Sequence, residues 1–225
     1  MPDLHLVIGN KAYSSWSLRP WIAMKAQGLV FRETVVGLQQ SDTAAQIKKY
    51  SAAAKVPVLV HGAITVWESL AILDYLADTF PDKAWWPKDP PARAQARSVS
   101  AEMHAGFSNL RNHMTMNIRQ SVPNKSRPEG VNTDIARIDE LWKECRGRFG
   151  GETGPFLFGA FSNADAMYAP VVTRFKTYGV IPTLDPIGRA YCETILNHPD
   201  MKDWYAAGLA ETTVIRTYEE QALAP

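Results

Sequence analysis

The chain has 225 residues, of which 46% are hydrophobic and 21% are charged, as is typical of a globular protein. Its 24 Lys and Arg residues nearly balance 23 Asp and Glu residues, and the net charge of +1 gives no broad field to attract nucleic acid or an anionic membrane. It shows neither a charged-then-apolar leader nor a run of 18 or more apolar residues, so we expect a soluble, cytoplasmic protein.

The first 80 residues alternate between strand and helix patterns. We predict strands at 4–9 and 31–36, helices at 15–27, 38–50 and 68–80, and a hairpin from the runs 56–60 and 63–67. Gly28 is expected to end the first helix. The resulting order β-α-β-α-β-β-α is a small α/β unit with the crossover connections that parallel strands need.

A proline-rich break, "PDKAWWPKDPPARA", separates this unit from a region of helix and loop patterns. We therefore predict an α/β domain at 1–81, a linker at 82–91 and an all-helical domain at 92–225. The helices expected in the second domain cover 92–119, 133–149, 163–178, 186–196 and 199–208. Ser162 and Asp165 have the spacing of a capping box, and Cys145 and Cys192 are expected to be buried free thiols.

Three serines, Ser14, Ser15 and Ser17, lie where the first strand passes into the first helix. Serine is a common helix N-cap, which gives the cluster a purely structural interpretation. A second interpretation is that these hydroxyl groups hold a ligand at the helix N-terminus.

Several motifs resemble glutathione transferases. "SSWSLRPWIAM" is similar to the serine motif of the zeta class, and "KVPVLV" followed by "WESLAILDYLADTFP" resembles the glutathione-binding half of theta-class and many bacterial members. "FLFGAFSNADA" resembles the family's entry into a core helix of the second domain. The resemblance covers the whole chain and implies a thioredoxin-like N-terminal domain followed by an all-α domain. It also implies a homodimer with the site near the subunit interface.

The resemblance implies that Ser14 activates the thiol of glutathione, since it aligns with the family's activating serine. Ser15 would cap the helix or assist Ser14, and Ser17 is the reserve candidate for the activating serine. Tyr13 is a rival because other classes use a tyrosine near this strand end, but it precedes the aligned serine by one residue. A thiol of pKa about 8.5 is mostly protonated at pH 7, so such an enzyme must stabilise the thiolate.

The same resemblance implies five further glutathione-binding residues. Val56 would pair its backbone with the peptide part of the ligand because the bond to Pro57 is cis in the family. Lys55 would attract a carboxylate, Ser69 would bind the γ-glutamyl carboxylate at a helix N-terminus, and Glu68 would face the α-amino group. Each position also has a structural interpretation: a trans edge-strand proline, a solvated lysine and ordinary helix capping.

A second-substrate pocket is expected near the end of the first helix of the second domain, with Met116 and Arg119 as possible lining residues. We predict a glutathione transferase that uses glutathione as co-substrate and acts on a small electrophile. One alternative is a glutathione-dependent cis–trans isomerase of the maleylacetoacetate type, which needs a basic pocket from Arg111 and Arg119. Another alternative is a non-catalytic glutathione-binding homologue.

Two departures from the zeta-class pattern weaken the isomerase alternative. Trp16 stands in place of a cysteine, and Glu68 stands in place of a glutamine. The five histidines show no metal-ligand spacing, so no metal is expected.

Overall fold

The computed structural model describes residues 3–151 and 154–223. The strands are β1 (Leu4–Gly9), β2 (Arg32–Val36), β3 (Val58–His61) and β4 (Ile64–Trp67). The helices of the N-terminal part are α1 (Ser15–Ala26), α2 (Thr43–Lys48) and α3 (Ser69–Thr79). The later helices are α4 (Pro90–Ala105), α5 (Ser108–His113), α6 (Glu129–Cys145), α7 (Asn163–Thr177), α8 (Pro186–Asn197), α9 (Pro199–Ala210) and α10 (Arg216–Leu223).

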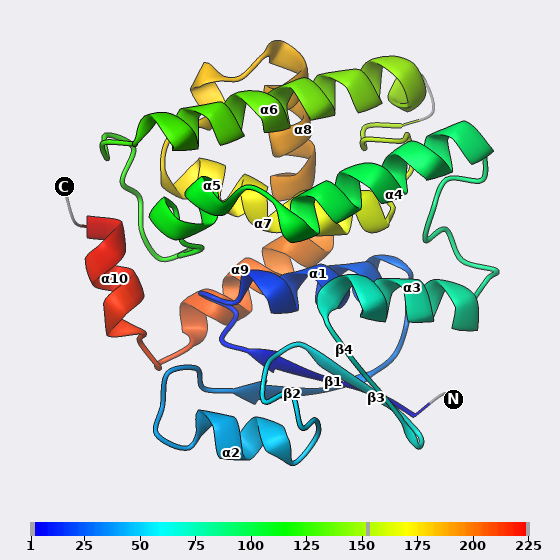
Figure 1. Cartoon of the computed structure of the whole chain (residues 1–225), viewed down its shortest axis with the longest axis vertical. Coiled ribbons are helices and arrows are strands. Elements are labelled where there is room, and N and C mark those ends of the chain that lie inside the picture. The colour runs from blue at the N-terminus through cyan, green and yellow to red at the C-terminus, as the bar shows by residue number, and fades with distance from the viewer. Residues whose placement is uncertain (1–2, 152–153, 224–225) are drawn as a thin grey trace.

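The four strands form one mixed sheet in the order β2-β1-β3-β4. β1 pairs parallel with β2 and antiparallel with β3, so that Leu6 lies between Glu33 and Leu59, and β3 pairs antiparallel with β4. This is the thioredoxin-like arrangement that the sequence predicts, joined to a helical region (Figure 1).

The two faces of the sheet are covered by different helices. Helices α1 and α3 lie on the face toward the helical region, and α2 lies on the opposite face (Figure 1). Because successive side chains of a strand point to opposite faces, Leu6 and Ile8 of β1 join the large core shared with the helices. Val7 joins a smaller core with Val36, Ile47 and Val58 under α2.

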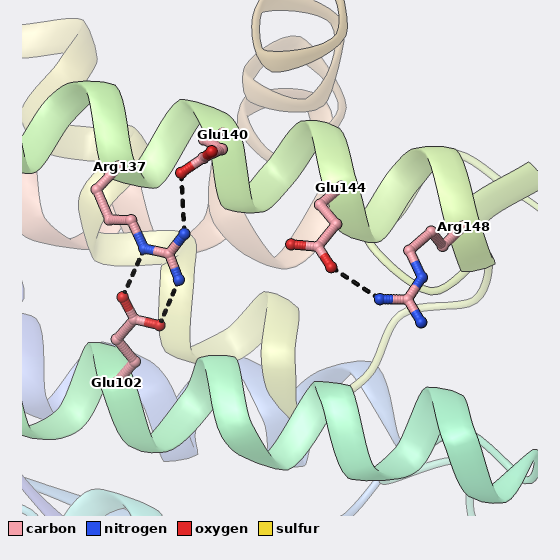
Figure 2. A network of polar contacts seen from close by, with 5 residues as sticks. All are labelled: Glu102, Arg137, Glu140, Glu144 and Arg148. Carbon is pink, nitrogen blue, oxygen red and sulfur yellow. Dashed lines mark hydrogen bonds and ion pairs between the residues drawn. The ribbon is translucent and has the colours of Figure 1, made fainter.

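Helices α4 and α6 lie side by side, and a network of exposed charges links them (Figure 2). Arg137 of α6 donates to both carboxylate oxygens of Glu102 in α4, at 2.9 and 3.2 Å, and to Glu140 at 2.9 Å. Arg148 pairs with Glu144 at 2.8 Å. Exposed ion pairs contribute little to stability. The buried Trp142 of α6 packs instead against Tyr168 and Phe175 of α7 and Tyr191 of α8.

The prediction of one long helix over 92–119 is wrong. Helix α4 ends at Ala105, and α5 begins at Ser108 after a break at Gly106 and Phe107. Gly106 donates its N–H to the carbonyl of Glu102, and Phe107 has a left-handed backbone with φ 60°. Helix α10 was not predicted, because its eight residues are mostly polar and have a weak apolar pattern.

The predicted capping box is confirmed at the start of α7. The buried Asp165 carboxylate accepts hydrogen bonds from the backbone N–H groups of Leu157 and Ser162, at 3.0 and 2.8 Å, and from the hydroxyls of Ser162 and Tyr191. Cys145 and Cys192 are buried free thiols, as expected. Across residues 3–151 and 154–223, every helix is too short or too polar to cross a membrane.

Candidate active site

The serine cluster joins the end of β1 to the start of α1. Ser14 is the N-cap of α1, and its Oγ accepts from the N–H of Ser17 at 3.4 Å. The Ser14 hydroxyl donates to Ser17 Oγ at 2.7 Å, and Ser17 Oγ also accepts from the N–H of Gly9 at 3.0 Å. Ser17 is fully buried, so it serves as the link that fixes Ser14 to the strand.

Ser15 is the first residue of α1, and Ser14 rather than Ser15 is the capping residue. The Ser15 Oγ accepts from Nη2 of Arg174 in α7, at 3.2 Å. Tyr13 donates its hydroxyl to Glu219 of α10 at 2.6 Å, and burial together with this carboxylate raises the pKa of Tyr13 to about 12. The Tyr13 hydroxyl therefore stays protonated and is directed at α10.

A cavity of about 180 Å³ lies between α1 and the β3–β4 hairpin. We call it the strand-side cavity; it is lined by Trp16, Lys55, Val56, Pro57, Trp67 and Glu68. The structure thus brings four of the predicted residues, Lys55, Val56, Pro57 and Glu68, to one cavity. The Val56–Pro57 peptide bond is cis, as the resemblance implies.

Ser69 lies at the N-terminus of α3, directly after Glu68, whose backbone is left-handed with φ 70°. The Ser69 Oγ is buried and has no hydrogen-bond partner within the described residues. The Glu68 side chain is about half exposed, and its Oε2 lies 3.9 Å from Nε2 of His104. A helix N-terminus with an unused hydroxyl is suited to binding a carboxylate.

A second cavity, of about 190 Å³, lies beside the first one. We call it the helix-side cavity; it is lined by Tyr13, Ser14, Ser15, Trp16, Leu38, Val56, Arg111, Thr115, Met116, Arg174 and Tyr218. Trp16 and Val56 line both cavities. Met116 lies where the sequence predicts, and Arg119 does not: its guanidinium donates to the carbonyls of Gly208 and Glu211.

The helix-side cavity is cationic. Arg174 is buried, and burial together with the neighbouring Arg111 lowers its pKa to about 10. Arg174 Nε donates to the carbonyl of Met114 at 2.7 Å, and Arg111 Nε donates to the carbonyl of Gly106 at 2.9 Å. Both arginines are therefore held in place by backbone carbonyls, and among the described residues neither forms an ion pair with a carboxylate.

Sequence reasoning missed Arg174 and a second buried arginine, Arg19. Both are charged residues inside helices whose other residues are almost all buried. A charged side chain is rarely buried without a partner, so an arginine within an almost wholly apolar helical stretch was the available sign of a buried charge. The partners themselves come from distant parts of the chain and leave no mark in local spacing. Among the described residues, no cluster of three His, Cys, Asp or Glu side chains could hold a metal ion.

The fold and the paired cavities define a thioredoxin-like protein with a helical C-terminal region and a site between the two. The family model of the glutathione S-transferase N-terminal domain matches residues 13–79. Glutathione S-transferase 1 of Dianthus caryophyllus is 32% identical over 191 residues, which cover 79% of this chain and 83% of that protein. The chain belongs to the glutathione transferase family.

Two further comparisons agree with this family. A probable maleylacetoacetate isomerase of Caenorhabditis elegans is 37% identical over 99 residues, which cover 44% of this chain and only 46% of that protein. The crystal structure of a glutathione transferase homologue from Burkholderia, with bound glutathione, matches with a TM-score of 0.68. It covers 92% of this chain and 98% of its own at 20% identity, which supports the fold.

Proposed function

We propose that this enzyme binds glutathione in the strand-side cavity and directs its thiolate at a small electrophile in the helix-side cavity. The observation that carries this proposal is that the two cavities adjoin at Trp16 and Val56, with the Ser14 and Ser15 hydroxyls on the wall of the second one. The bound glutathione of the Burkholderia homologue supports the choice of ligand.

The strand-side cavity offers groups that match each end of a tripeptide. The backbone of Val56 pairs with the peptide part, and Lys55 attracts a carboxylate. Glu68 on the cavity wall faces the α-amino group. Directly after Glu68, at the N-terminus of α3, the buried Ser69 hydroxyl has no partner among the described residues and donates to the γ-glutamyl carboxylate.

The thiol then lies at the N-terminus of α1, where Ser14 stabilises the thiolate. In the structure Ser14 donates to Ser17 Oγ, so its O–H must rotate toward the sulfur to act on the thiolate. The Ser17 hydroxyl can then donate to Ser14 Oγ in return, which keeps the cluster satisfied. Lowering the thiol pKa by about two units corresponds to roughly 2.7 kcal/mol, and the helix N-terminus and the nearby arginines act in the same direction.

The reaction follows from this arrangement. The thiol proton leaves to solvent, and the thiolate sulfur attacks the electrophilic carbon to form a carbon–sulfur bond. In substitution the leaving group departs with the electron pair of its bond; in addition the π electrons of the double bond move to the neighbouring carbon, which takes a proton from solvent. Holding both reactants in adjoining cavities supplies proximity, and the serine hydroxyl supplies the reactive form of sulfur.

Calorimetry with glutathione and with S-methylglutathione tests the binding part of the proposal, and a panel of chloronitroarenes tests turnover. We expect both ligands to bind and at least one electrophile to be conjugated. Binding without turnover of any electrophile would instead favour the non-catalytic homologue.

A second candidate function is glutathione-dependent isomerisation of a small dicarboxylate. Arg111 and Arg174 in the helix-side cavity favour it, since two guanidinium groups can bind two carboxylates. The isomerase name of the Caenorhabditis relative agrees with this candidate. Incubation with a cis-configured oxo-dicarboxylate and glutathione distinguishes the two functions, because isomerisation regenerates glutathione and conjugation consumes it.

We also propose a cytoplasmic homodimer. Strand β4 exposes Ile64 and Trp67 to 49% and 50%, and such apolar side chains are suited to a subunit interface. Light scattering during gel filtration measures the mass directly, and a monomeric mass would exclude the dimer.

A further inference from the structure

Trp16 occupies a position that connects every part of the candidate site. It is the second residue of α1, it lines both cavities, and it is partly buried. A side chain on the shared wall controls how far each cavity extends toward the other. The helix-side cavity, at about 190 Å³, is small compared with typical ligand pockets of about 300 to 1,000 Å³.

Two guanidinium groups lie over the indole ring of Trp16. The central carbon of Arg19 is 4.2 Å from the ring centroid, and that of Arg111 is 4.8 Å from it. His104 contacts the same ring edge-on, with centroids 5.4 Å apart. A Trp face attracts a guanidinium, and the attraction is strongest where water is excluded.

Arg19 shows how much this stacking matters. It is fully buried and donates its Nε to the carbonyl of Met167 at 3.1 Å, while its Nη1 and Nη2 have no hydrogen-bond partner in the described chain. Burial lowers the pKa of Arg19, and repulsion from the nearby charges of Arg111 and Arg174 lowers it further. The electron-rich ring of Trp16 therefore stabilises part of the positive charge of Arg19 and Arg111 at the cavity wall.

From these contacts we propose that Trp16 is the specificity-determining residue of the helix-side cavity. Its ring limits the size of the second substrate, and by stacking on Arg111 it positions a cation at the cavity wall. The substrate class that fits both effects is a small electrophile with an anionic group. This inference rests on the proposed function, because it concerns the same site.

Substitutions at Trp16 can separate the two effects. Trp16→Phe keeps an aromatic face, Trp16→Leu keeps bulk without an aromatic face, and Trp16→Ala removes both. Trp86→Ala is the matched control, since Trp86 lies over Arg97 instead and is outside the lining of both cavities.

The measurement is the ratio of kcat/KM for 4-chloro-3-nitrobenzoate to that for the neutral 4-chloro-3-nitrotoluene, at saturating glutathione. Because both electrophiles meet the same glutathione-loaded enzyme, the ratio is independent of glutathione affinity. A charge-assisted hydrogen bond predicts a preference of about 10- to 100-fold for the benzoate in the wild type. Trp16→Phe and Trp86→Ala should keep most of this preference, and Trp16→Leu should lose it.

A bulkier neutral substrate, a chloronitronaphthalene, tests size. We expect Trp16→Ala to raise its kcat/KM by about tenfold relative to Trp16→Leu, since a missing contact of this size is worth 10-fold or more in selectivity. Circular dichroism shows whether each variant is folded, and Trp16→Phe with Trp16→Leu decides the charge effect even if Trp16→Ala does not fold.

Equal benzoate preference in wild type, Trp16→Phe and Trp16→Leu would overturn the inference, as would a wild type with no preference. Failure of the proposed function has a different signature, because the wild type would then bind no glutathione in calorimetry or would turn over neither electrophile.

Discussion

At the scale of single residues, the candidate site depends on hydroxyl groups whose neighbours are already fixed. Ser17 links Ser14 to the N–H of Gly9, Arg174 holds Ser15, and Glu219 holds Tyr13. Ser69 differs from these, since its buried hydroxyl has no partner in the described chain. A buried polar group without a partner costs stability, so it is a place where a ligand can restore a hydrogen bond.

Ser69→Ala should weaken glutathione binding by about 1.5 to 3 kcal/mol, the value of a hydrogen bond to a charged group. The contact is remote from sulfur and is present in both ground and transition states, so kcat should change little. Calorimetry and steady-state kinetics measure the two effects. Ser98→Ala in α4 is a suitable control, and an unchanged affinity in Ser69→Ala would remove Ser69 from the site.

At the scale of elements, the break between α4 and α5 positions Arg111 at the helix-side cavity. Gly106 makes this break possible because a Cβ there would lie 2.9 Å from the backbone oxygen of Glu102. Arg111 then donates back to the carbonyl of Gly106. The periodicity of 92–119 hides the break, since Met103 and Leu110 are buried on either side of it.

Gly106→Ala should lower the free energy of unfolding by about 1 to 3 kcal/mol, as expected for overpacking against backbone. Gly147→Ala is the matched control, because in the described chain nothing beyond its sequence neighbours and its own helix backbone lies within 4 Å of its added Cβ. Urea denaturation measures both variants. Equal stability of the two variants would show that the turn at Gly106 tolerates a side chain.

The capping box of α7 gives a prediction about pH. Burial raises the pKa of Asp165 to about 6 from its ordinary 3.8, so the folded state holds this proton more tightly than the unfolded state. This contribution to stability is complete below pH 3.8 and is lost as the pH rises through about 6, by about 3 kcal/mol in total. The side chain of Asp165→Asn does not titrate.

The free energy of unfolding of the wild type, minus that of Asp165→Asn, should therefore decrease between pH 4 and pH 7. Urea denaturation at a series of pH values gives this difference. A difference that increases with pH would mean that the four hydrogen bonds to the carboxylate outweigh burial and hold the pKa of Asp165 low.

At the scale of the whole molecule, contacts between distant segments build the site. Glu211, after α9, accepts from the backbone N–H groups of Lys11 and Ala12 at 2.7 and 3.1 Å, and Trp204 donates to the carbonyl of Lys11 at 2.9 Å. These contacts tie the end of the helical region to the loop that carries the serine cluster.

Glu211→Ala should lower the free energy of unfolding by about 2 kcal/mol, because it leaves two partly buried N–H groups without an acceptor. Glu220→Ala, on the exposed side of α10, is the control and should change stability by less than about 0.5 kcal/mol. Thermal or urea denaturation measures the stability of both variants. Equal losses would mean that water satisfies the two N–H groups as well as Glu211 does.

Local patterns predicted the sheet, its flanking helices and most of the helical region. The hairpin turn, the stop at Gly28 and the capping box at Ser162 each depend on residues within a few positions of one another, which is why spacing reveals them. The motifs that resemble the family named Lys55, Val56, Pro57 and Glu68, which are four of the six residues that line the strand-side cavity, but not Trp16 or Trp67. Their role in binding glutathione stays a prediction.

The helix-side cavity was much harder to predict. Its wall combines residues of α1 with Arg111, Arg174 and Tyr218, which are about 100 to 200 positions away in sequence. No local pattern records that Arg174 meets Ser15, or that Arg119 turns to carbonyls at the end of α9 instead. Packing between helices determines these contacts, and a single sequence does not encode them in its periodicity.

The central claim is that Ser14 stabilises the thiolate of bound glutathione, and the ultraviolet thiolate absorbance of the bound ligand against pH tests it most directly. Ser14→Ala should bind glutathione but titrate at higher pH than the wild type, with a loss of about 10² to 10³ in rate near pH 7 for one missing donor. Ser17→Ala should shift the curve less, since Ser17 lies one helical turn further on and acts only through its hydrogen bond with Ser14. Tyr13→Phe should shift it much less, since the Tyr13 hydroxyl donates to Glu219. A Ser14→Ala titration identical to the wild type, beside a shift in Tyr13→Phe or Ser17→Ala, would contradict the claim and leave Ser14 as a helix cap alone.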